Sequence, residues 1–532
     1  MFGLQRSSQK SSHPMSDAGA AAQLVGELPL GNPNSALAEA SAWLESIEAE
    51  TFTPHHTLNL VSMLDEAVQG CLEDLTLAYV GAKPGSPGLA VDWRVLTDYL
   101  DRLGNAYCGI MDRCGEARHA DLAARLPIAI VRAMRATTRS MKVSWLRYLP
   151  PDRGSWESLV RCYRMARGRG LVKTMGTAYA ADAQPTCPMH ELTVGVMLAA
   201  AAPQSLTPRQ VEIAYRIAFA GRGDFTLSLG RTEQWAHYLF DLDNPGTPAR
   251  IPEQIGESEA LMYFSAEAVL PQLKSVLEAS RGAGVTMMPE IPYGAEFGAS
   301  EKLLVIEHVL RFWDDSPPAR RDERKRINTK IHVEVGAQSL RAALESAVPD
   351  AARPALTIDD GSSKAGAGPQ PRVAPLNVWT LTDFSSRGIG ARFSRRLDRW
   401  LKVGSLIAFK LERSEKWCVA IVRRLRTDAR NQTDVGCQII AKAASLVKLE
   451  GLASPGTMRD LTGSGALVHT TAVVLPEDPQ LEARASLLFE PGTNAPGQSF
   501  VMRHGGTVQS VRLGAVAETI DGWDRVEFDV LG

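Results

Sequence analysis

The period of the apolar residues changes once along this chain of 532 residues, close to Pro317. Before that point apolar side chains recur at helical spacing, as in the run Leu303, Ile306, Leu310 and Trp313. After it, apolar and polar residues alternate, which is the repeat of a half-buried β-strand. A chain with helices first and strands afterwards is predicted to be a multidomain α+β protein, in which an all-α helical N-terminal region precedes antiparallel β structure.

The helical region is predicted to span residues 29–313. One helix start is well marked, with Thr207 as N-cap, Pro208 at the first helical position and Gln210 closing a capping box. Residues 1–28 are rich in Ser, Gly and Ala and show no sustained apolar period, so we expect a disordered tail there.

The β region is predicted to divide into three parts. Residues 314–330 combine a Pro-containing terminator with a run of basic residues, which indicates a hinge and a basic arm. Alternating strands follow over 331–448, interrupted by a Gly-, Ser- and Pro-rich flexible insertion at about 340–376. Further short strands over 449–532 indicate a second small β module, either a separate barrel or an extension of the first.

Composition excludes several classes of protein. The net charge is −2, so no general DNA- or RNA-binding surface is expected. The seven cysteines contain no C-x-x-C pair, which favours a reducing compartment over a disulfide framework. The N-terminus lacks the apolar core of a signal peptide and no apolar run is long enough to span a bilayer. We therefore expect a cytoplasmic protein without membrane insertion.

Three residues at the exit of a predicted strand have the spacing D-x-S-x-x-G. They are Asp383, Ser385 and Gly388, and we refer to residues 383–388 as the hexad. An ionised Asp accepts hydrogen bonds, Ser adds a hydroxyl, and Gly permits a close backbone approach or a positive φ. The same residues also suit an ordinary turn that ends a strand.

A basic segment lies directly upstream of the first predicted strand. Its cations are Arg320, Arg321, Arg324, Arg326 and Lys330. Arginine pairs with phosphate through two parallel hydrogen bonds and stacks on bases, whereas lysine keeps only the charge. Two arginine pairs with R-x-x-x-R spacing compete: the pair nearer to the strand has Lys330 at its second position, and the intact pair ends at Arg324, six residues farther away.

The basic arm, the strand, the hexad and the later strands in this order resemble the PilZ domain, a bacterial receptor module for cyclic di-GMP. The resemblance covers about residues 320–445. It implies a six-stranded β-barrel that binds the nucleotide between the arm and the hexad, with no cofactor other than this ligand. Its implied ligand-binding residues are Arg320, Arg321, Arg324, Arg326, Lys330, Asp383, Ser385 and Gly388.

Two functions from different classes remain open at this point. In the first, the chain is a cytoplasmic cyclic di-GMP receptor that couples nucleotide binding to its helical domain and to an unidentified protein partner. In the second, the barrel is a degenerate scaffold that has lost the nucleotide and acts through protein–protein contacts, which the Lys at the second arginine position favours. The sequence shows no P-loop, G-x-S-x-G or H-E-x-x-H motif, and Cys187 and His190 are followed by no second pair of ligands at zinc spacing. We therefore expect no catalytic residues, no metal and no enzyme, a hydrolase in the helical region being the least favoured alternative.

Overall fold

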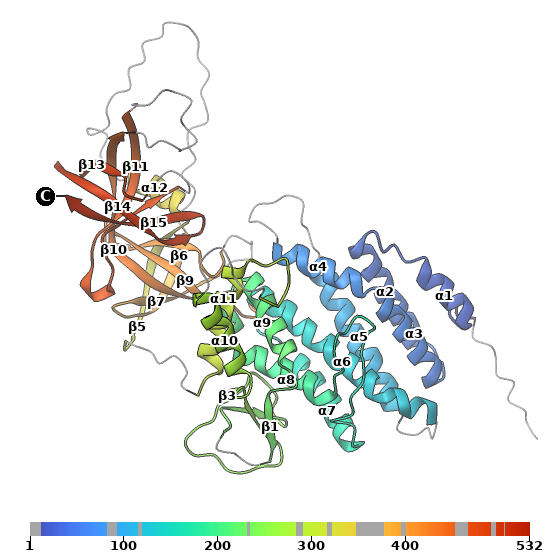
Figure 1. Ribbon diagram of the computed structural model, residues 1–532. Helices are drawn as coiled ribbons and strands as arrows, with labels where there is room; N and C mark the ends of the chain where they lie inside the picture. The colour runs from blue at the N-terminus through green and yellow to red at the C-terminus, as the bar shows by residue number, and fades with distance from the viewer. Residues whose placement is uncertain are drawn as a thin grey trace, which may run out of the picture. The chain divides into compact units, whose positions relative to one another are not determined.

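A computed structural model describes most of the chain, which divides into two compact units, residues 1–319 and 320–532. The described residues are 12–81, 93–114, 120–230, 235–282, 291–315, 322–346, 377–394, 401–452, 467–490, 496–504 and 506–531. The first unit is mostly helical and the second is mostly β, as the change of period predicts (Figure 1). None of the described helices is long and apolar enough to cross a membrane.

The first unit contains eleven described α-helices and a small sheet. The helices are α1 (Ala18–Gly26), α2 (Pro33–Ala49), α3 (Pro54–Ala67), α4 (Gln69–Gly81), α5 (Trp93–Arg113), α6 (Ala120–Leu146), α7 (Arg153–Gly168), α8 (Pro188–Ala200), α9 (Pro208–Ala220), α10 (Leu270–Gly282) and α11 (Ala299–Trp313). The capping box of α9 is present as predicted, with Thr207, Pro208 and Gln210 in their expected roles. An antiparallel sheet that was not predicted interrupts the helices. Its strands, in spatial order, are β1 (Thr226–Leu229), β4 (Leu261–Ser265), β2 (Tyr238–Asp241) and β3 (Ala249–Arg250).

The N-terminal residues differ from the disordered tail expected over 1–28. Helix α1 begins after Asp17, whose carboxylate accepts hydrogen bonds from the backbone N–H groups of Gly19 and Ala20. Met15 and Ala21 are fully buried in the helical core. An Ala-rich segment with an Asp cap has high helix propensity and needs few large apolar residues to dock, which is why the tail prediction failed for residues 12–28.

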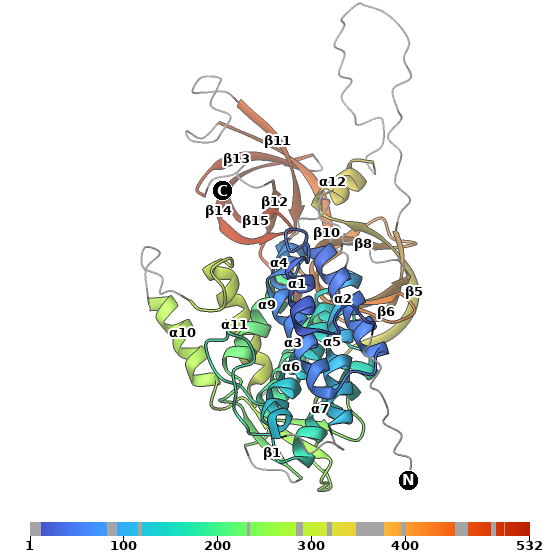
Figure 2. The same cartoon turned by 90° about the vertical axis from the view of Figure 1, so that its right-hand side faces the viewer.

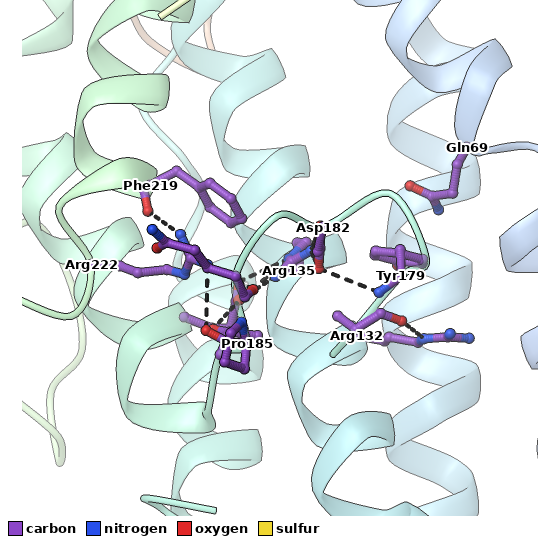
Figure 3. A network of polar contacts seen from close by, with 12 residues as sticks. Gln69, Arg132, Arg135, Tyr179, Asp182, Pro185, Phe219 and Arg222 are labelled. Carbon is purple, nitrogen blue, oxygen red and sulfur yellow. Dashed lines mark hydrogen bonds and ion pairs between the residues drawn. The ribbon is translucent and has the colours of Figure 1, made fainter. Parts of the chain in front are cut away.

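Helix α6 carries a row of basic side chains that are buried in the first unit. Arg135 is 1% exposed and lies 2.7 Å from Glu191 of α8, itself 1% exposed, and 2.7 Å from Asp182 in the α7–α8 connection (Figure 3). Lys142, about two turns further along the same face of α6, pairs with the buried Glu212 of α9 at 2.7 Å. Because each buried cation meets a carboxylate from another element, these pairs fix how the elements pack.

The α7–α8 connection is held on α6 by further contacts. The Nε of Arg132 donates to the Ala178 carbonyl at 2.8 Å, and its guanidinium lies 4.8 Å from the ring centre of Tyr179. The Tyr179 hydroxyl donates to the fully buried carboxylate of Asp65 in α3. Burial raises the pKa of Asp65, and Arg132 and the tyrosine hydroxyls oppose this shift. The connection is therefore an integral part of the helical core.

Helix α11 is attached to α8 by two side chains. Trp313 is fully buried and donates from Nε1 to the Met197 carbonyl at 3.0 Å. His308 lies 2.7 Å from the Ala201 carbonyl through Nε2. Burial lowers the pKa of His308 to about 4, below an ordinary value of 6.5.

The neutral His308 imidazole should make the first unit sensitive to acid. Unfolding frees the ring to protonate, so the stability it contributes is complete above pH 6.5 and is lost as the pH falls from 6.5 towards 4. Between pH 7 and pH 5 this loss is about 2 kcal/mol. We expect His308→Gln to reduce the pH dependence of the unfolding free energy by that amount, measured by urea denaturation at both pH values. His55→Gln, at an exposed position, is the control, and an unchanged pH dependence in His308→Gln would contradict this assignment.

The second unit contains two rings of antiparallel strands. The first ring has the order β10 (Gln432–Leu452), β7 (Gly388–Ser394), β6 (Asn377–Phe384), β5 (Lys325–Val335), β8 (Leu406–Leu411) and β9 (Trp417–Thr427), and pairing of β9 with β10 closes it. Side chains such as Ile331, Trp379 and Leu381 are buried, as the alternation predicts. This closed six-stranded barrel is the one expected from the resemblance.

The C-terminal strands form a second ring on the far half of β10. Its order is β10, β11 (Leu467–Leu475), β12 (Ser486–Phe489), β15 (Trp523–Leu531), β14 (Thr507–Ile520) and β13 (Ser499–His504), and β13 pairs back onto β10 (Figure 2). The boundary placed after residue 448 from the sequence therefore lies inside β10. The two rings share this strand of 21 residues.

Part of the predicted insertion at 340–376 is regular structure. Helix α12 (Ala337–Ser346) follows β5 directly and buries Ala337, Leu340 and Leu344 against the barrel core. These three residues have helical spacing, a signal that the Gly- and Pro-rich composition of the following residues obscured. Residues 347–376 lie outside the described residues.

Candidate functional site

The hexad forms the end of β6 and the turn into β7. The Ser385 N–H donates to the Gly388 carbonyl at 2.8 Å, and the Ser385 hydroxyl lies 3.4 Å from the same oxygen. A Cβ on Gly388 would lie 3.0 Å from the carbonyl oxygen of Cys437 in β10, closer than side chains ordinarily approach a backbone oxygen. Glycine at this position therefore serves the close approach of β7 to β10, and Ser385 serves the turn.

Asp383 lies over a glycine of the neighbouring strand. It is in register with Gly390 of β7, and a Cβ at Gly390 would lie 2.1 Å from Asp383 Oδ2. The space for the carboxylate exists because residue 390 has no side chain. Arg324 reaches the same carboxylate, with Nη1 lying 2.5 Å from Oδ1.

The basic arm is largely part of the barrel. Strand β5 begins at Lys325, six residues earlier than the alternation predicted, and pairs with β6 along its length. Arg326 is in register with Asp383, whereas Lys330 is in register with Thr380, beyond an irregularity between Arg326 and Thr329. The structure thus brings one residue of each competing pair to Asp383, Arg324 from the intact pair and Arg326 from the nearer one, but not Lys330.

The structure does not place the other predicted cations next to the hexad. Lys330 is exposed and lies opposite Thr380, and Arg320 and Arg321 lie outside the described residues. Arg324 also lies near the buried Cys437: burial raises the pKa of this thiol and Arg324 opposes the shift. The described part of the arm thus presents Arg324 and Arg326 to the Asp383 end of the site.

A surface concavity of about 680 Å³ lies beside the hexad on the outer face of the first ring. Its lining residues come from β5, β6, β7 and β10: Arg326, Ile327, Asn328, Val378, Thr380, Thr382, Arg392, Phe393, Ser394 and Gln432. The volume is in the range of small-molecule sites, and hydroxyl, guanidinium and apolar side chains alternate around it. Arg392 is held on its β10 side by a two-point contact with Asp434, at 2.6 and 3.2 Å.

Two further side chains of the hexad turn have partners. The Ser386 hydroxyl donates to Asp322 of the arm at 2.8 Å, and the Arg387 Nη2 donates to Glu482 at 2.7 Å. The arm therefore contacts the turn twice, through Asp322 and Arg324. The arrangement presents carboxylates, hydroxyls and guanidinium groups around one edge of a barrel, the groups that recognise guanine edges and phosphodiesters.

Two family models match parts of the chain. The model described as cyclic-di-GMP receptor FimW, N-terminal domain, matches residues 19–231. The model described as cyclic-di-GMP receptor FimW, middle PilZ domain, matches residues 346–445, and the two spans together cover more than half of the chain. The chain belongs to the FimW family of cyclic-di-GMP receptors. No curated protein and no solved structure gave a match.

The PilZ-domain match contains the hexad but begins after β5. Asp383, Ser385 and Gly388 lie inside the matched span, and Arg324 and Arg326 lie upstream of it. The assignment of the arm to this PilZ domain therefore depends on the contacts described above, above all on the one between Arg324 and Asp383.

Sequence reasoning missed several residues of the site. Asp322 is an acidic residue within the basic segment, and its carboxylate accepts a hydrogen bond from the Ser386 hydroxyl. Gly390 carries no motif position, and its role depends on the strand register. Glu482 lies 95 residues from its partner Arg387, so no local pattern could connect them. Of these residues, Asp322 alone had a local pattern that indicated a role, because an acidic residue within a basic segment suggests a specific partner.

Proposed function

We propose that this protein binds cyclic di-GMP at the edge of its first ring, between the arm and the hexad. The observation that carries the proposal is the contact of Arg324 with Asp383, which places the arm on the hexad of a PilZ domain. In the bound state, Asp383 accepts hydrogen bonds from the N–H groups of a guanine edge. Arg324 and Arg326 pair with the phosphodiesters and stack on the bases.

Binding and base specificity test this proposal together. Full-length protein is dialysed to equilibrium against radiolabelled cyclic di-GMP, with unlabelled cyclic di-GMP or cyclic di-AMP as competitor. We expect saturable binding that cyclic di-GMP displaces and cyclic di-AMP does not, because the carboxylate of Asp383 requires the donor-rich edge of guanine. Absence of binding would favour the degenerate scaffold. Equal displacement by both nucleotides would show that Asp383 does not select guanine over adenine.

The two arginine pairs make opposite predictions about the arm. Replacing Arg324 by Ala should weaken binding of cyclic di-GMP about 10- to 150-fold, the loss expected for a charge-assisted hydrogen bond. Replacing Lys330 by Ala should change the affinity far less, because Lys330 lies opposite Thr380 and away from the hexad. Calorimetric titration of both variants measures the two losses of affinity. A larger loss in Lys330→Ala would show that the ligand is bound by the pair nearer to the strand, Arg326 and Lys330.

We further propose that ligand binding is communicated to the helical unit, which contacts a protein partner. Residues 316–321 are all that separates Asp315, next to α11, from Asp322 at the hexad turn. A ligand that changes the contacts of Asp322 and Arg324 with the hexad therefore changes the constraint on α11 through a short covalent connection. Small-angle scattering with and without saturating cyclic di-GMP tests this step: we expect a ligand-dependent change, and identical curves for a protein shown to be saturated would contradict it.

A further inference from the structure

The hexad turn is joined to the second ring by an ion pair. Arg387, the fifth residue of the hexad, donates through Nη2 to Glu482 Oε1 at 2.7 Å. Glu482 belongs to the connection between β11 and β12, two strands of the second ring. The pair therefore links the candidate ligand site to a part of the chain that carries no assigned role.

The connection that carries Glu482 is a closed turn, residues 478–483. Asp478 and Ala483 pair as an isolated bridge, and the short helix η3 (Pro479–Leu481) lies between them. Glu482 has φ +55° and ψ 32°, the left-handed region that residues other than glycine seldom adopt. The turn therefore holds Glu482 in an uncommon backbone conformation.

Both turns are fastened to the shared strand β10. The Ile439 N–H donates to the Arg387 carbonyl at 2.9 Å, which anchors the hexad turn. Three residues further along β10, the Lys442 Nζ lies 3.0 Å from Asp478 Oδ2 and 2.7 Å from Gln480 Oε1, which anchors the second turn. Strand β10 thus holds both turns, one through its backbone and the other through the Lys442 side chain, and Arg387 and Glu482 form an ion pair between the two turns.

An anionic ligand can displace Glu482 from this ion pair. The side chain of Arg387 is 31% exposed and that of Glu482 is 67% exposed, so solvent screens the pair strongly. A phosphodiester offers a guanidinium two parallel charge-assisted hydrogen bonds, a stronger contact than one exposed carboxylate oxygen. An anionic ligand at the hexad therefore competes favourably with Glu482 for Arg387.

We infer that Arg387 is a switch residue that reports occupancy of the hexad to the second ring. Without ligand, Arg387 holds the 478–483 turn through Glu482. With ligand, Arg387 pairs with a phosphate, and the turn loses its contact with the hexad. The inference rests on the proposed function, and by linkage a partner that draws Glu482 away from Arg387 raises the affinity for the nucleotide.

The test compares Glu482→Gln, Arg387→Gln and wild type in calorimetry and hydrogen exchange with cyclic di-GMP. Glu482→Gln should raise the affinity about two- to fivefold, because the competing carboxylate is removed. Ligand should speed exchange of the Leu481, Glu482 and Ala483 amides in wild type, since these amides close the turn. Arg387→Gln should bind more weakly and show no ligand-dependent change in them. Glu450→Gln, which breaks the exposed pair with Arg503 in the second ring, is the control and should match wild type.

The outcomes separate the switch from the binding site. The switch would be overturned, and the proposed function left intact, if wild type binds the nucleotide but two results are negative. These are an affinity of Glu482→Gln equal to that of wild type and amide exchange in the turn that the ligand does not change. Absence of binding to wild type would overturn both. Without ligand, Glu482→Gln and Arg387→Gln should already speed amide exchange in the 478–483 turn. Exchange as slow as in wild type in both variants would show that the ion pair does not restrain the turn, and would overturn the switch.

Discussion

Gly390→Ala should weaken the binding of cyclic di-GMP about 10- to 100-fold, although residue 390 lies outside the hexad. The added Cβ would lie 2.1 Å from Oδ2 and 2.6 Å from Cγ of Asp383. The atom it meets first is the end of a side chain, so the carboxylate moves and the strands stay paired. Asp383 then loses both its position over β7 and its contact with Arg324.

The register partner of Gly390 supplies a matched control. Gly436 of β10 lies directly opposite Gly390, and a Cβ there would lie 3.5 Å from Arg424 Cβ, an ordinary contact. Gly436→Ala should therefore bind as wild type in calorimetry, while Gly390→Ala binds no better than Asp383→Ala. Equal affinities for Gly390→Ala and wild type would show that the position of Asp383 over Gly390 does not matter for the ligand.

Arg135→Met should destabilise the helical unit by about 3–5 kcal/mol, the loss expected when one partner of a buried ion pair is removed. Glu191, which is 1% exposed, would lose its contact with the Arg135 guanidinium and keep the hydrogen bond from the Thr186 hydroxyl at 2.9 Å. Asp182, which holds the α7–α8 connection, would lose its contact as well. The unfolding transition of the full chain, followed by far-UV circular dichroism in urea, measures this loss.

Two further variants keep this prediction decisive. Arg161→Met breaks an exposed pair with Asp112 in the same unit and should cost about 1 kcal/mol or less. The double variant Arg135→Met with Glu191→Met should lose less than the sum of the single changes, because neither charge is left buried alone. Additive losses would show that the two side chains contribute independently.

Much of the second unit was predictable because strands alternate with a period of two. Ile331, Trp379 and Leu381 alternate with polar residues and are buried, and the hexad lies at the end of its strand as predicted. The start of β5 could not be predicted in this way. The side chains from Lys325 to Lys330 are mostly exposed, so this part of the strand shows no apolar alternation and resembles a charged arm.

The residues that connect distant segments could not be predicted. The choice of Arg324 over Lys330 depends on the irregularity in the pairing of β5 with β6, which no local pattern encodes. The basic residues of α6 have the spacing of a solvated helix face, yet Arg135 is buried because carboxylates 47 and 56 residues away neutralise it. Contacts of this kind arise from tertiary packing, which the periodicity of one segment does not report.

Calorimetric titration of cyclic di-GMP into the full-length protein tests the central claim most directly, with Asp383→Ala, Arg324→Ala and Glu450→Gln titrated in parallel. The account predicts saturable binding to wild type and to Glu450→Gln, and loss of most of the affinity in both site variants. Absence of heat up to high-micromolar ligand, or binding to Asp383→Ala as tight as to wild type, would contradict it and leave the hexad as a turn.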